Sequence, residues 1–447
     1  MNDTVIQGKA LGPSAQLLSK DSRCTAAAKI LGTVFAQFDG SVEVDLWGQA
    51  RITVGSGRRR FGLQVKDPAC IRAMVLGGGA LSLAEAHFKG QLDYDGDIYE
   101  VLALRKYFPT LKFGAMEKAK LAMSALQLPS DKAGAAAMGA AKAGSAFKKS
   151  HTRESDTDAI QFHYDVSNEF YGTFLDGQMV YSCGYFAGET DALENAQSNK
   201  LDHVCKKLQL KPGERFLDIG CGWGAMVCWA AKHYGVKAHG VTLSDAQLET
   251  AKMRIRKEGL SGLVTVEKRD YRDLEGEGRF DKISSIGMFE HVGLKQLPEY
   301  NQTVFRLLSA NGLFLNHGIT HAAEGWDTGL NSAFLQKWVF PDGELDRVSN
   351  IAGGMESAGF EIIDVENLRF HYAQTLREWV KRLEANRLQA QGYVGQERYK
   401  VWRMYMAGSA LEFEEGETGI HQILASKWSR SAGLVPATRR YMYESER

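Results

Sequence analysis

The pattern of apolar positions divides the chain into two parts. From about residue 160 onward, short apolar runs alternate with segments in which apolar residues recur every three or four positions. This order predicts parallel strands joined by crossover helices, which is an α/β fold with a doubly wound, Rossmann-like sheet. The predicted strands cover residues 215–220, 236–243, 263–270, 280–287 and 312–320, and residues 365–430 are predicted to be mostly helical. In such sheets the ligand binds beyond the carboxyl ends of the strands.

The N-terminal part has a different pattern. Strands are predicted at residues 41–48, 50–55 and 59–65, and a helix is predicted over residues 80–108. We therefore expect a tail over residues 1–29 and a smaller α+β domain over residues 30–128. Residues 129–158 are rich in Ala, Gly, Lys and Ser and lack large apolar side chains, so we expect a flexible linker. The doubly wound domain, with its C-terminal helices, then occupies residues 159–447.

Charge and cysteine content narrow the possible functions. The 54 Lys and Arg residues balance the 54 Asp and Glu residues, so no overall field favours nucleic acid as a partner. The six cysteines show no paired CxxC spacing, which indicates free thiols in a reducing compartment and no metal site. We find neither an apolar stretch of about 18 residues nor a signal-peptide pattern, which predicts a cytoplasmic protein.

A glycine-rich turn follows the first predicted strand of the larger domain. Gly220, Gly222 and Gly224 would let the backbone turn sharply and approach a ligand closely, although a purely structural turn could have the same composition. A dinucleotide-binding turn has GxGxxG spacing and an acidic residue at the end of the second strand. This turn has GxGxG spacing, and Thr242 lies where the acid would be. Asp218 could meet a positively charged amino-acid moiety, which favours S-adenosylmethionine as the ligand.

Several longer motifs occur together and in order. They are FHYDVSNEFYGTFLDGQMVYSCGYF (162–186), FLDIGCGWG (216–224), GVTLSDAQ (240–247), RDYRDL (269–274), SIGMFEHVG (285–293), NHGIT (316–320) and HYAQTL (371–376). With these motifs the sequence resembles the cyclopropane fatty acid synthase family, whose members use S-adenosylmethionine to alkylate unsaturated acyl chains and include mycolic acid methyltransferases. The resemblance is strong over residues 160–425 and looser over residues 30–128. It implies a class I methyltransferase domain preceded by a lipid-engaging domain.

The resemblance also implies which residues form the site. The positions that match those around S-adenosylmethionine are Tyr164, Tyr181, Ser182, Asp218, Gly220, Gly222, Gly224, Thr242, Gln247, Asp270, Tyr271 and Arg272. The positions that match the family's bicarbonate-holding cluster are Cys183, Glu290, His317, Ile319 and Tyr372. In the family, the bicarbonate ion is the general base beside the transferred methyl group.

Each member of this cluster also has a purely structural interpretation. Cys183 could be a small buried apolar residue, and His317 could be a core histidine. Glu290 could cap the helix that begins near Leu294, and Tyr372 could pack against the C-terminal helices. Glu290 and His317 stand at the carboxyl ends of neighbouring predicted strands, which favours a functional role for both.

The activity implied by the resemblance is transfer of a methyl group to the double bond of an unsaturated phospholipid acyl chain, followed by proton loss to bicarbonate and closure of a cyclopropane. Asn316 precedes His317, where the family often has an apolar residue, and Gly318 follows it. A methyl-branched, methylene or furan-precursor product is therefore the alternative. A non-catalytic S-adenosylmethionine sensor and a methyltransferase of small soluble acceptors are the other hypotheses.

A basic and apolar segment bears on how the lipid is reached. Residues 104–126 combine lysine and arginine with large apolar side chains, which is typical of an interfacial membrane anchor and equally of a solvated helix face. Residues 57–61 (GRRRF) are a weaker candidate. We expect a protein peripherally associated with the inner face of the membrane, and the resemblance suggests a homodimer.

Overall fold

The computed structural model describes residues 21–130, 167–324, 344–427 and 435–443, together with Phe334, Trp338 and Val339. The chain forms two compact units. The first unit comprises residues 1–147 and 395–404, and the second comprises residues 148–394 and 405–447. Almost all of the linker predicted over residues 129–158 lies outside the described residues.

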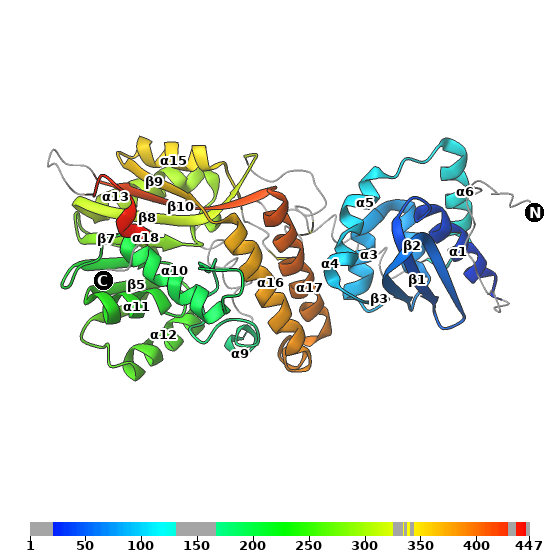
Figure 1. Ribbon diagram of the computed structural model, residues 1–447, viewed down its shortest axis with the longest axis horizontal. Coiled ribbons are helices and arrows are strands. Elements are labelled where there is room, and N and C mark those ends of the chain that lie inside the picture. The colour runs from blue at the N-terminus through cyan, green and yellow to red at the C-terminus, as the bar shows by residue number, and fades with distance from the viewer. Residues whose placement is uncertain are drawn as a thin grey trace, which may run out of the picture. The chain divides into compact units, whose positions relative to one another are not determined.

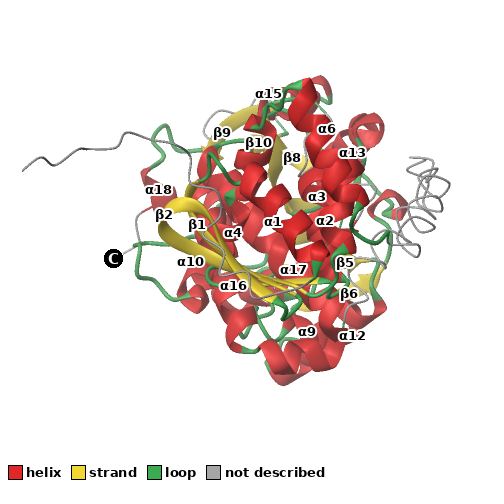
Figure 2. Cartoon of the chain, turned by 90° about the vertical axis from the view of Figure 1, so that its right-hand side faces the viewer, coloured by secondary structure: helices red, strands yellow, loops and turns green. Residues whose placement is uncertain are grey.

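A three-stranded antiparallel sheet, in the order β1, β2, β3, lies at the centre of the first unit. The elements of this unit are α1 (Ser22–Val34), β1 (Asp39–Leu46), β2 (Ala50–Val65), α2 (Ala69–Ala73), the π-helical turn η1 (Met74–Gly78), α3 (Gly79–Phe88), β3 (Leu92–Asp95), α4 (Ile98–Leu102), α5 (Leu104–Thr110) and α6 (Ala115–Leu126). Figure 2 shows α1 beside the curved strands β1 and β2. Ile30 and Phe35 share one apolar core with Val42, Val44 and Phe61 of these strands, which confirms a small α+β unit.

Two predictions for the first unit are wrong in detail. The helix predicted over residues 80–108 is interrupted by β3, because Gly90 and Gly96 adopt φ angles of +75° and +109° on either side of the strand. The predicted tail is too long, since α1 begins at Ser22. Asp21 caps this helix by accepting a hydrogen bond from the Arg23 N–H. Residues 1–20 lie outside the described residues.

The second unit contains a seven-stranded sheet in the order β6, β5, β4, β7, β8, β10, β9 (Figure 1). Its strands are β4 (Arg215–Ile219), β5 (Lys237–Thr242), β6 (Val264–Lys268), β7 (Phe280–Ile286), β8 (Leu308–His321), β9 (Glu361–Asn367) and β10 (Thr418–Ser426). Strands β4 to β8 are parallel, whereas β10 pairs antiparallel with both β8 and β9. The five predicted strands and the doubly wound α/β class are confirmed.

Helices cover both faces of this sheet. They are α9 (Asn168–Tyr171), α10 (Leu193–Lys207), α11 (Ala225–Tyr234), α12 (Asp245–Lys257), α13 (Leu297–Leu307), α15 (Val348–Ser357), α16 (Arg369–Ala385), α17 (Arg387–Glu415) and α18 (Arg440–Tyr443), with the 3-10 turns η2 (Tyr271–Asp273), η3 (Phe289–His291) and η4 (Leu294–Gln296). Neighbouring residues of one strand join different cores: Phe216 packs with Val227 of α11, and Leu217 packs with Val304 of α13 and Met355 of α15. This burial on both faces explains why three of the four buried residues of β4 are apolar, with Asp218 as the exception.

The C-terminal prediction is correct for α16 and α17 but misses β10. Gly416, with a φ of +82°, ends α17 in the left-handed conformation. The chain then runs back along β8, where Ile420 lies opposite Ile319 and Ile423 lies opposite Asn316. The insertion of β10 between β8 and β9 therefore places α16 and α17 at one end of the sheet.

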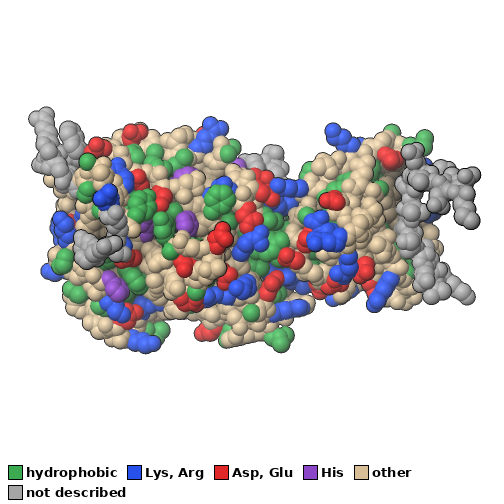
Figure 3. All heavy atoms as spheres, in the orientation of Figure 1, with side chains coloured by type: hydrophobic (Ala, Val, Ile, Leu, Met, Phe, Trp, Pro, Cys, Tyr) green, Lys and Arg blue, Asp and Glu red, His purple; other side chains and the backbone are tan. Residues whose placement is uncertain are grey.

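Several global expectations can be compared with the structure. No helix in the described part of the chain is long and apolar enough to span a membrane. All six cysteines are free and buried, so they are thiols as predicted. Among the described residues, no group of three or more His, Cys, Asp or Glu is placed to hold a metal ion. On the face shown in Figure 3, basic and acidic side chains are interspersed.

Candidate active site

The predicted glycine turn connects β4 to α11. Gly220 and Gly222 have φ angles of +78° and +53°, in the region that favours glycine. The N–H groups of Gly220 and Cys221 donate to the Val241 carbonyl at 3.0 and 2.9 Å, which ties the turn to β5. A Cβ on Gly222 would meet no protein atom within 4 Å. Glycine is therefore required there by backbone conformation, and the space beside it is open.

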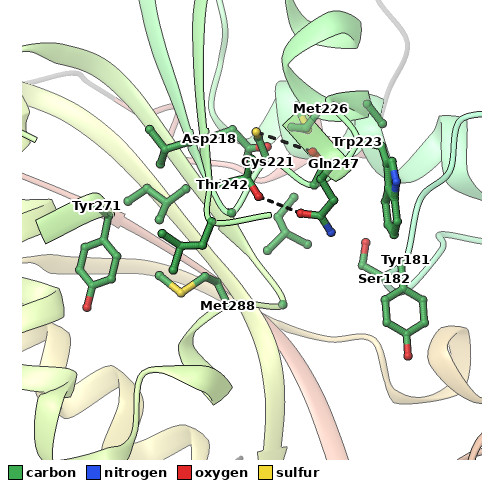
Figure 4. Close-up of a pocket in the computed structure, with 18 of the residues that line it drawn as sticks. Tyr181, Ser182, Asp218, Cys221, Trp223, Met226, Thr242, Gln247, Tyr271 and Met288 are labelled. Carbon is green, nitrogen blue, oxygen red and sulfur yellow. Dashed lines mark hydrogen bonds between the residues drawn. The ribbon is translucent and has the colours of Figure 1, made fainter. Parts of the chain in front are cut away.

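A cavity of about 160 Å³ lies at this turn (Figure 4). Its lining includes ten of the residues predicted to surround S-adenosylmethionine, namely Tyr181, Ser182, Asp218, Gly220, Gly222, Thr242, Gln247, Asp270, Tyr271 and Arg272. Figure 4 shows Tyr181 and Ser182 on one side of the cavity and Tyr271 on the other, with Thr242 and Gln247 between them. Segments that are far apart in sequence thus converge on one elongated site.

Two of the predicted cofactor positions are not found in this lining. Gly224 lies against α12, where a Cβ would come within 2.9 Å of the Ala251 Cβ. The missing side chain of Gly224 therefore allows α11 and α12 to pack closely, instead of making room for a ligand. Tyr164 lies outside the described residues.

Hydrogen bonds fix the wall of the cavity at the ends of β5 and β6. The Thr242 hydroxyl donates to Gln247 Oε1 at 2.8 Å, and the Gln247 N–H donates to Ser244 Oγ at 3.4 Å. The spacing of Ser244 and Gln247 also predicts a capping box, but only half of it forms, because the Gln247 side chain pairs with Thr242. The Asp270 carboxylate accepts the Arg272 N–H at 2.9 Å and pairs with its guanidinium at 2.6 Å, which holds η2 in place.

Two buried charged residues, Asp218 and Lys200, also line this cavity. The Ser284 hydroxyl donates to Asp218 at 2.6 Å, and burial raises the pKa of Asp218 to about 7. Lys200, on α10, is 2 % exposed and donates through Nζ to Ser182 Oγ at 3.1 Å. Sequence reasoning missed Lys200. The available signal was a lysine on the apolar face of α10, next to Leu201 and in line with Val204.

A second cavity, of about 100 Å³, brings together the whole predicted catalytic cluster: Cys183, Glu290, His317, Ile319 and Tyr372. The rest of its lining is largely apolar and includes Leu345, Leu376, Phe413 and Ile420. Both cavities are lined by Tyr181, Ser182, Ile286, Gly287 and His291. The two spaces therefore meet at the carboxyl end of β7.

Glu290 lies in turn η3, four residues beyond the end of β7. Its Oε1 accepts a hydrogen bond from the Ile319 N–H at 2.6 Å, whereas Oε2 is buried without a partner among the described residues. Burial raises the pKa of Glu290 to about 7. Glu290 does not cap the next helical turn, because the Leu294 N–H donates to Glu344 instead.

His317 is inside β8, so the prediction that it ends a strand is wrong. His317 nevertheless lies at the end of the parallel pairing between β7 and β8, where it is opposite Ile286. Beyond this point β8 continues and pairs with β10. Gln422 Nε2 donates to His317 Nδ1 at 3.3 Å, so the neutral imidazole carries its proton on Nε2. Nε2 is buried and has no partner among the described residues. Burial lowers the pKa of His317, which keeps the ring neutral.

The other cluster residues are held by packing and short contacts. The Cys183 thiol donates to the Gly184 carbonyl at 3.2 Å, and burial raises its pKa, so a thiolate is disfavoured. Tyr372, in the first turn of α16, packs its ring 4.8 Å from that of Phe413. The side chain of Asn316 is directed away from this cavity, since it accepts a hydrogen bond from the Tyr300 hydroxyl at 3.2 Å.

Helix α17 supplies cavity residues that sequence reasoning did not identify. Tyr405, Ser409 and Glu412 line the second cavity with Phe413. They recur at helical spacing, so they fall on one face of α17. Burial raises the pKa of Tyr405 to about 12, which keeps its phenol neutral.

Comparisons with known proteins agree with this geometry. The family described as "Mycolic acid cyclopropane synthetase" matches residues 151–423. A "Probable fatty acid methyltransferase" of Pseudomonas putida is 44% identical over 66% of this chain and 76% of its own length. "Probable fatty acid methyltransferase Rv3720" of Mycobacterium tuberculosis is 36% identical over 88% of this chain and 90% of its own length. The "Cyclopropane-fatty-acyl-phospholipid synthase" of Escherichia coli K12 is 38% identical over 59% of this chain and 66% of its own length.

Solved structures give the same result. The cyclopropane synthase MmaA2 from Mycobacterium tuberculosis has a TM-score of 0.58 and 29% identity, covering 61% of this chain and 98% of that one. The mycolic acid cyclopropane synthase CmaA1, complexed with SAH and CTAB, has a TM-score of 0.57 and 32% identity over the same shares. This chain therefore belongs to the mycolic acid cyclopropane synthetase family and is an S-adenosylmethionine-dependent methyltransferase.

Proposed function

We propose that this methyltransferase acts on the double bond of an unsaturated acyl chain in a membrane phospholipid and forms a cyclopropane ring. The observation that carries the proposal is the pair of adjoining cavities, one at the glycine turn and one that combines Glu290 and His317 with an apolar lining. The Escherichia coli relative is named for the same reaction on phospholipid. A small soluble acceptor would not require so apolar a second cavity.

The chemistry requires close alignment because an alkene is a weak nucleophile. Its π electrons form a bond to the sulfonium methyl carbon as the carbon–sulfur bond breaks, which leaves S-adenosylhomocysteine and a carbocation on the acyl chain. We assign the methyl group to the region that both cavities share, between Tyr181 and Gly287, where the alkene and the methyl group could be held in line. The rings of Tyr372 and Phe413 would stabilise the cation by their quadrupoles. Loss of a proton from the added methyl group then closes the ring.

The second cavity fits a small oxyanion such as bicarbonate. Glu290 Oε2 and His317 Nε2 are buried polar atoms without partners among the described residues. His317 can donate through Nε2, and Glu290 can donate when protonated, as a pKa of about 7 permits. Tyr372 would supply a third donor, whereas the Ile319 N–H already donates to Glu290. When bound, bicarbonate would supply the base that accepts the proton.

A methyl-branched, methylene or furan-precursor product is the second candidate. It would form if the cation were resolved without ring closure. The names of two relatives, both probable fatty acid methyltransferases, favour it. So does the "Sphingolipid C9-methyltransferase" of Komagataella phaffii, which is 31% identical over 62% of this chain and 59% of its own length.

Product analysis tests both candidates. The protein is incubated with S-adenosylmethionine carrying a trideuterated methyl group and with vesicles of an unsaturated phospholipid, and the released fatty acids are examined by mass spectrometry. A cyclopropane ring keeps two of the three deuterium atoms and resists mild hydrogenation. A methylene group is reduced by the same hydrogenation. A methyl branch keeps all three deuterium atoms. Glu290→Ala, which removes one of the proposed donors to bicarbonate, is expected to abolish product, whereas Glu249→Ala, the same change at an exposed position of α12, is expected to keep it. Absence of any labelled lipid would contradict the proposal.

We also propose that α6 docks on the membrane surface. Met116, Met123 and Leu126 are 71 %, 59 % and 61 % exposed, and the basic side chain of Lys120 borders them. The GRRRF segment is a poorer candidate, because Arg59 and Arg60 pair with Asp95 and Glu100.

Vesicle binding tests this surface. Met123→Glu is expected to weaken cosedimentation with anionic vesicles. Met253→Glu, at a methionine 55 % exposed on α12, is the matched control and should leave binding unchanged. Equal binding by both variants would contradict a role for α6. Dimer formation and location at the inner face of the membrane stay predictions.

A further inference from the structure

Lys200 is a buried charge for which the proposed reaction gives no role. The side chain lines the cofactor cavity and is 2 % exposed. Its Nζ donates to Ser182 Oγ at 3.1 Å, which is its only hydrogen bond among the described residues, and no described carboxylate forms an ion pair with it. Taking an ammonium group out of water is unfavourable unless an anion compensates it. A ligand that carries an anionic group into this cavity would compensate the charge of Lys200.

A second buried lysine of α10, Lys207, has the carboxylate partner that Lys200 lacks among the described residues. Lys207 is fully buried, and its Nζ lies 2.6 Å from Glu366 Oε2. Lys200 is two turns earlier and faces the cavity lining instead. Lys207 is thus paired with a carboxylate of the protein, whereas Lys200 faces a cavity that can hold a ligand.

The position of Lys200 identifies the part of the ligand that it meets. Its partner Ser182 lines both cavities, so Lys200 is next to the region to which we assign the methyl group. The methionine moiety of S-adenosylmethionine is attached to the same sulfur atom and carries one carboxylate and one ammonium group. The rest of the cavity extends past Thr242 to Tyr271 on the opposite side, which leaves that part for the nucleoside (Figure 4).

We propose that Lys200 binds the carboxylate of the methionine moiety of S-adenosylmethionine. Asp218, in the same lining, is placed to receive the ammonium group. Gln197 supports this arrangement, because its Nε2 donates to the Ser182 carbonyl at 2.9 Å and so fixes the residue that positions Nζ. The inference rests on the methyl-transfer function and deepens it, since it assigns the group by which the enzyme recognises its methyl donor.

The charge state of Lys200 is compatible with this role. Burial lowers the pKa of the ammonium group to about 8, and the negative charges of Asp176 and Asp218 act in the opposite direction. At neutral pH most of the lysine is therefore protonated. A bound carboxylate would favour the protonated form further.

Ligand binding, which needs no lipid, provides the test. Dissociation constants are measured by calorimetry for S-adenosylmethionine and for decarboxylated S-adenosylmethionine, which lacks only the carboxylate. The wild-type protein is expected to prefer the carboxylated ligand by at least about tenfold, as a charge-assisted hydrogen bond gives. In Lys200→Met the ratio of the two dissociation constants should fall towards one. Lys206→Met, which removes a more exposed lysine of α10 that pairs with Asp202, should retain it.

The outcomes separate this inference from the function on which it rests. A wild-type protein that binds both ligands equally, or a Lys200→Met variant that keeps the full preference, would overturn the role of Lys200. Neither result would affect the proposed reaction, which is judged by labelled lipid. The ratio of two affinities within one preparation is also insensitive to the fraction of folded protein, so a less stable variant still gives a result.

Discussion

Replacing Glu290 with glutamine is expected to stabilise the protein at alkaline pH. Glu290 Oε1 accepts the Ile319 N–H, and a glutamine oxygen can accept the same hydrogen bond. What the substitution removes is the charge that burial disfavours. Burial raises the pKa of this carboxyl from 4.5 to about 7, and each pKa unit corresponds to about 1.4 kcal/mol.

The direction of the effect with pH follows from the raised pKa. The folded protein favours protonated Glu290, so the contribution of this group to stability is fully present below pH 4.5 and is lost as the pH rises through about 7. At pH 8.5 the folded wild-type protein therefore holds a buried carboxylate at a cost of about 3 kcal/mol. At pH 5 the corresponding cost is below about 1 kcal/mol. Glutamine does not ionise, so the Glu290→Gln variant has no such cost at either pH.

Urea unfolding, followed by tryptophan fluorescence at pH 5 and pH 8.5, measures this difference. The gain in the free energy of unfolding of Glu290→Gln over wild type is expected to grow by about 2 to 3 kcal/mol between the two pH values. Glu249→Gln, at an exposed position, should show no such growth. A gain that does not depend on pH, or a Glu290→Gln variant less stable than wild type at pH 8.5, would refute the reasoning.

Two further substitutions probe the same cavity. Tyr372→Phe should lower the turnover number at least about a hundredfold, because it removes a hydrogen-bond donor at the reacting centre, while binding of S-adenosylmethionine measured by calorimetry stays unchanged. Gly318→Ala should lower the free energy of unfolding by about 1–3 kcal/mol, because its Cβ would come within 2.1 Å of Phe289 Cε1, next to Glu290. Gly353→Ala, whose Cβ would meet nothing within 4 Å, should cause no such loss; equal effects of the two alanines would contradict the packing argument.

Most of the fold could be predicted where burial imposed a simple pattern. Phe216, Leu217 and Ile219 are buried in the cores on the two faces of the sheet, so their apolar run identified β4 directly. β3 was missed because it has only four residues and lies between segments with helical periodicity. β10 was missed although Gly416 marks the end of α17, because the place of this strand between β8 and β9 is decided by long-range pairing.

The candidate site was predictable to the extent that its residues belong to contiguous motifs. Ten of the twelve cofactor positions and all five cluster positions line the two cavities. Lys200 and the α17 residues, such as Tyr405, were missed because they reach the site from helices that lie outside the contiguous motifs. The side-chain direction of Asn316 was equally hidden, since only the pairing register of β8 decides which residues face the cavity.

The two buried lysines of α10 should respond in opposite ways to the same substitution. Lys207→Met would leave Glu366 without its closest lysine partner; Lys207 is one of the groups that, against the effect of burial, hold the pKa of Glu366 at about 2. Breaking such a pair typically costs about 3–5 kcal/mol. Lys200→Met removes an ammonium group that has no carboxylate partner among the described residues, so the ligand-free protein should be as stable as wild type or more stable. Urea unfolding without and with S-adenosylmethionine measures both effects: the ligand should stabilise wild type more than Lys200→Met. A Lys200→Met variant that loses as much stability as Lys207→Met in the absence of ligand would show that Lys200 serves the fold, whatever it binds.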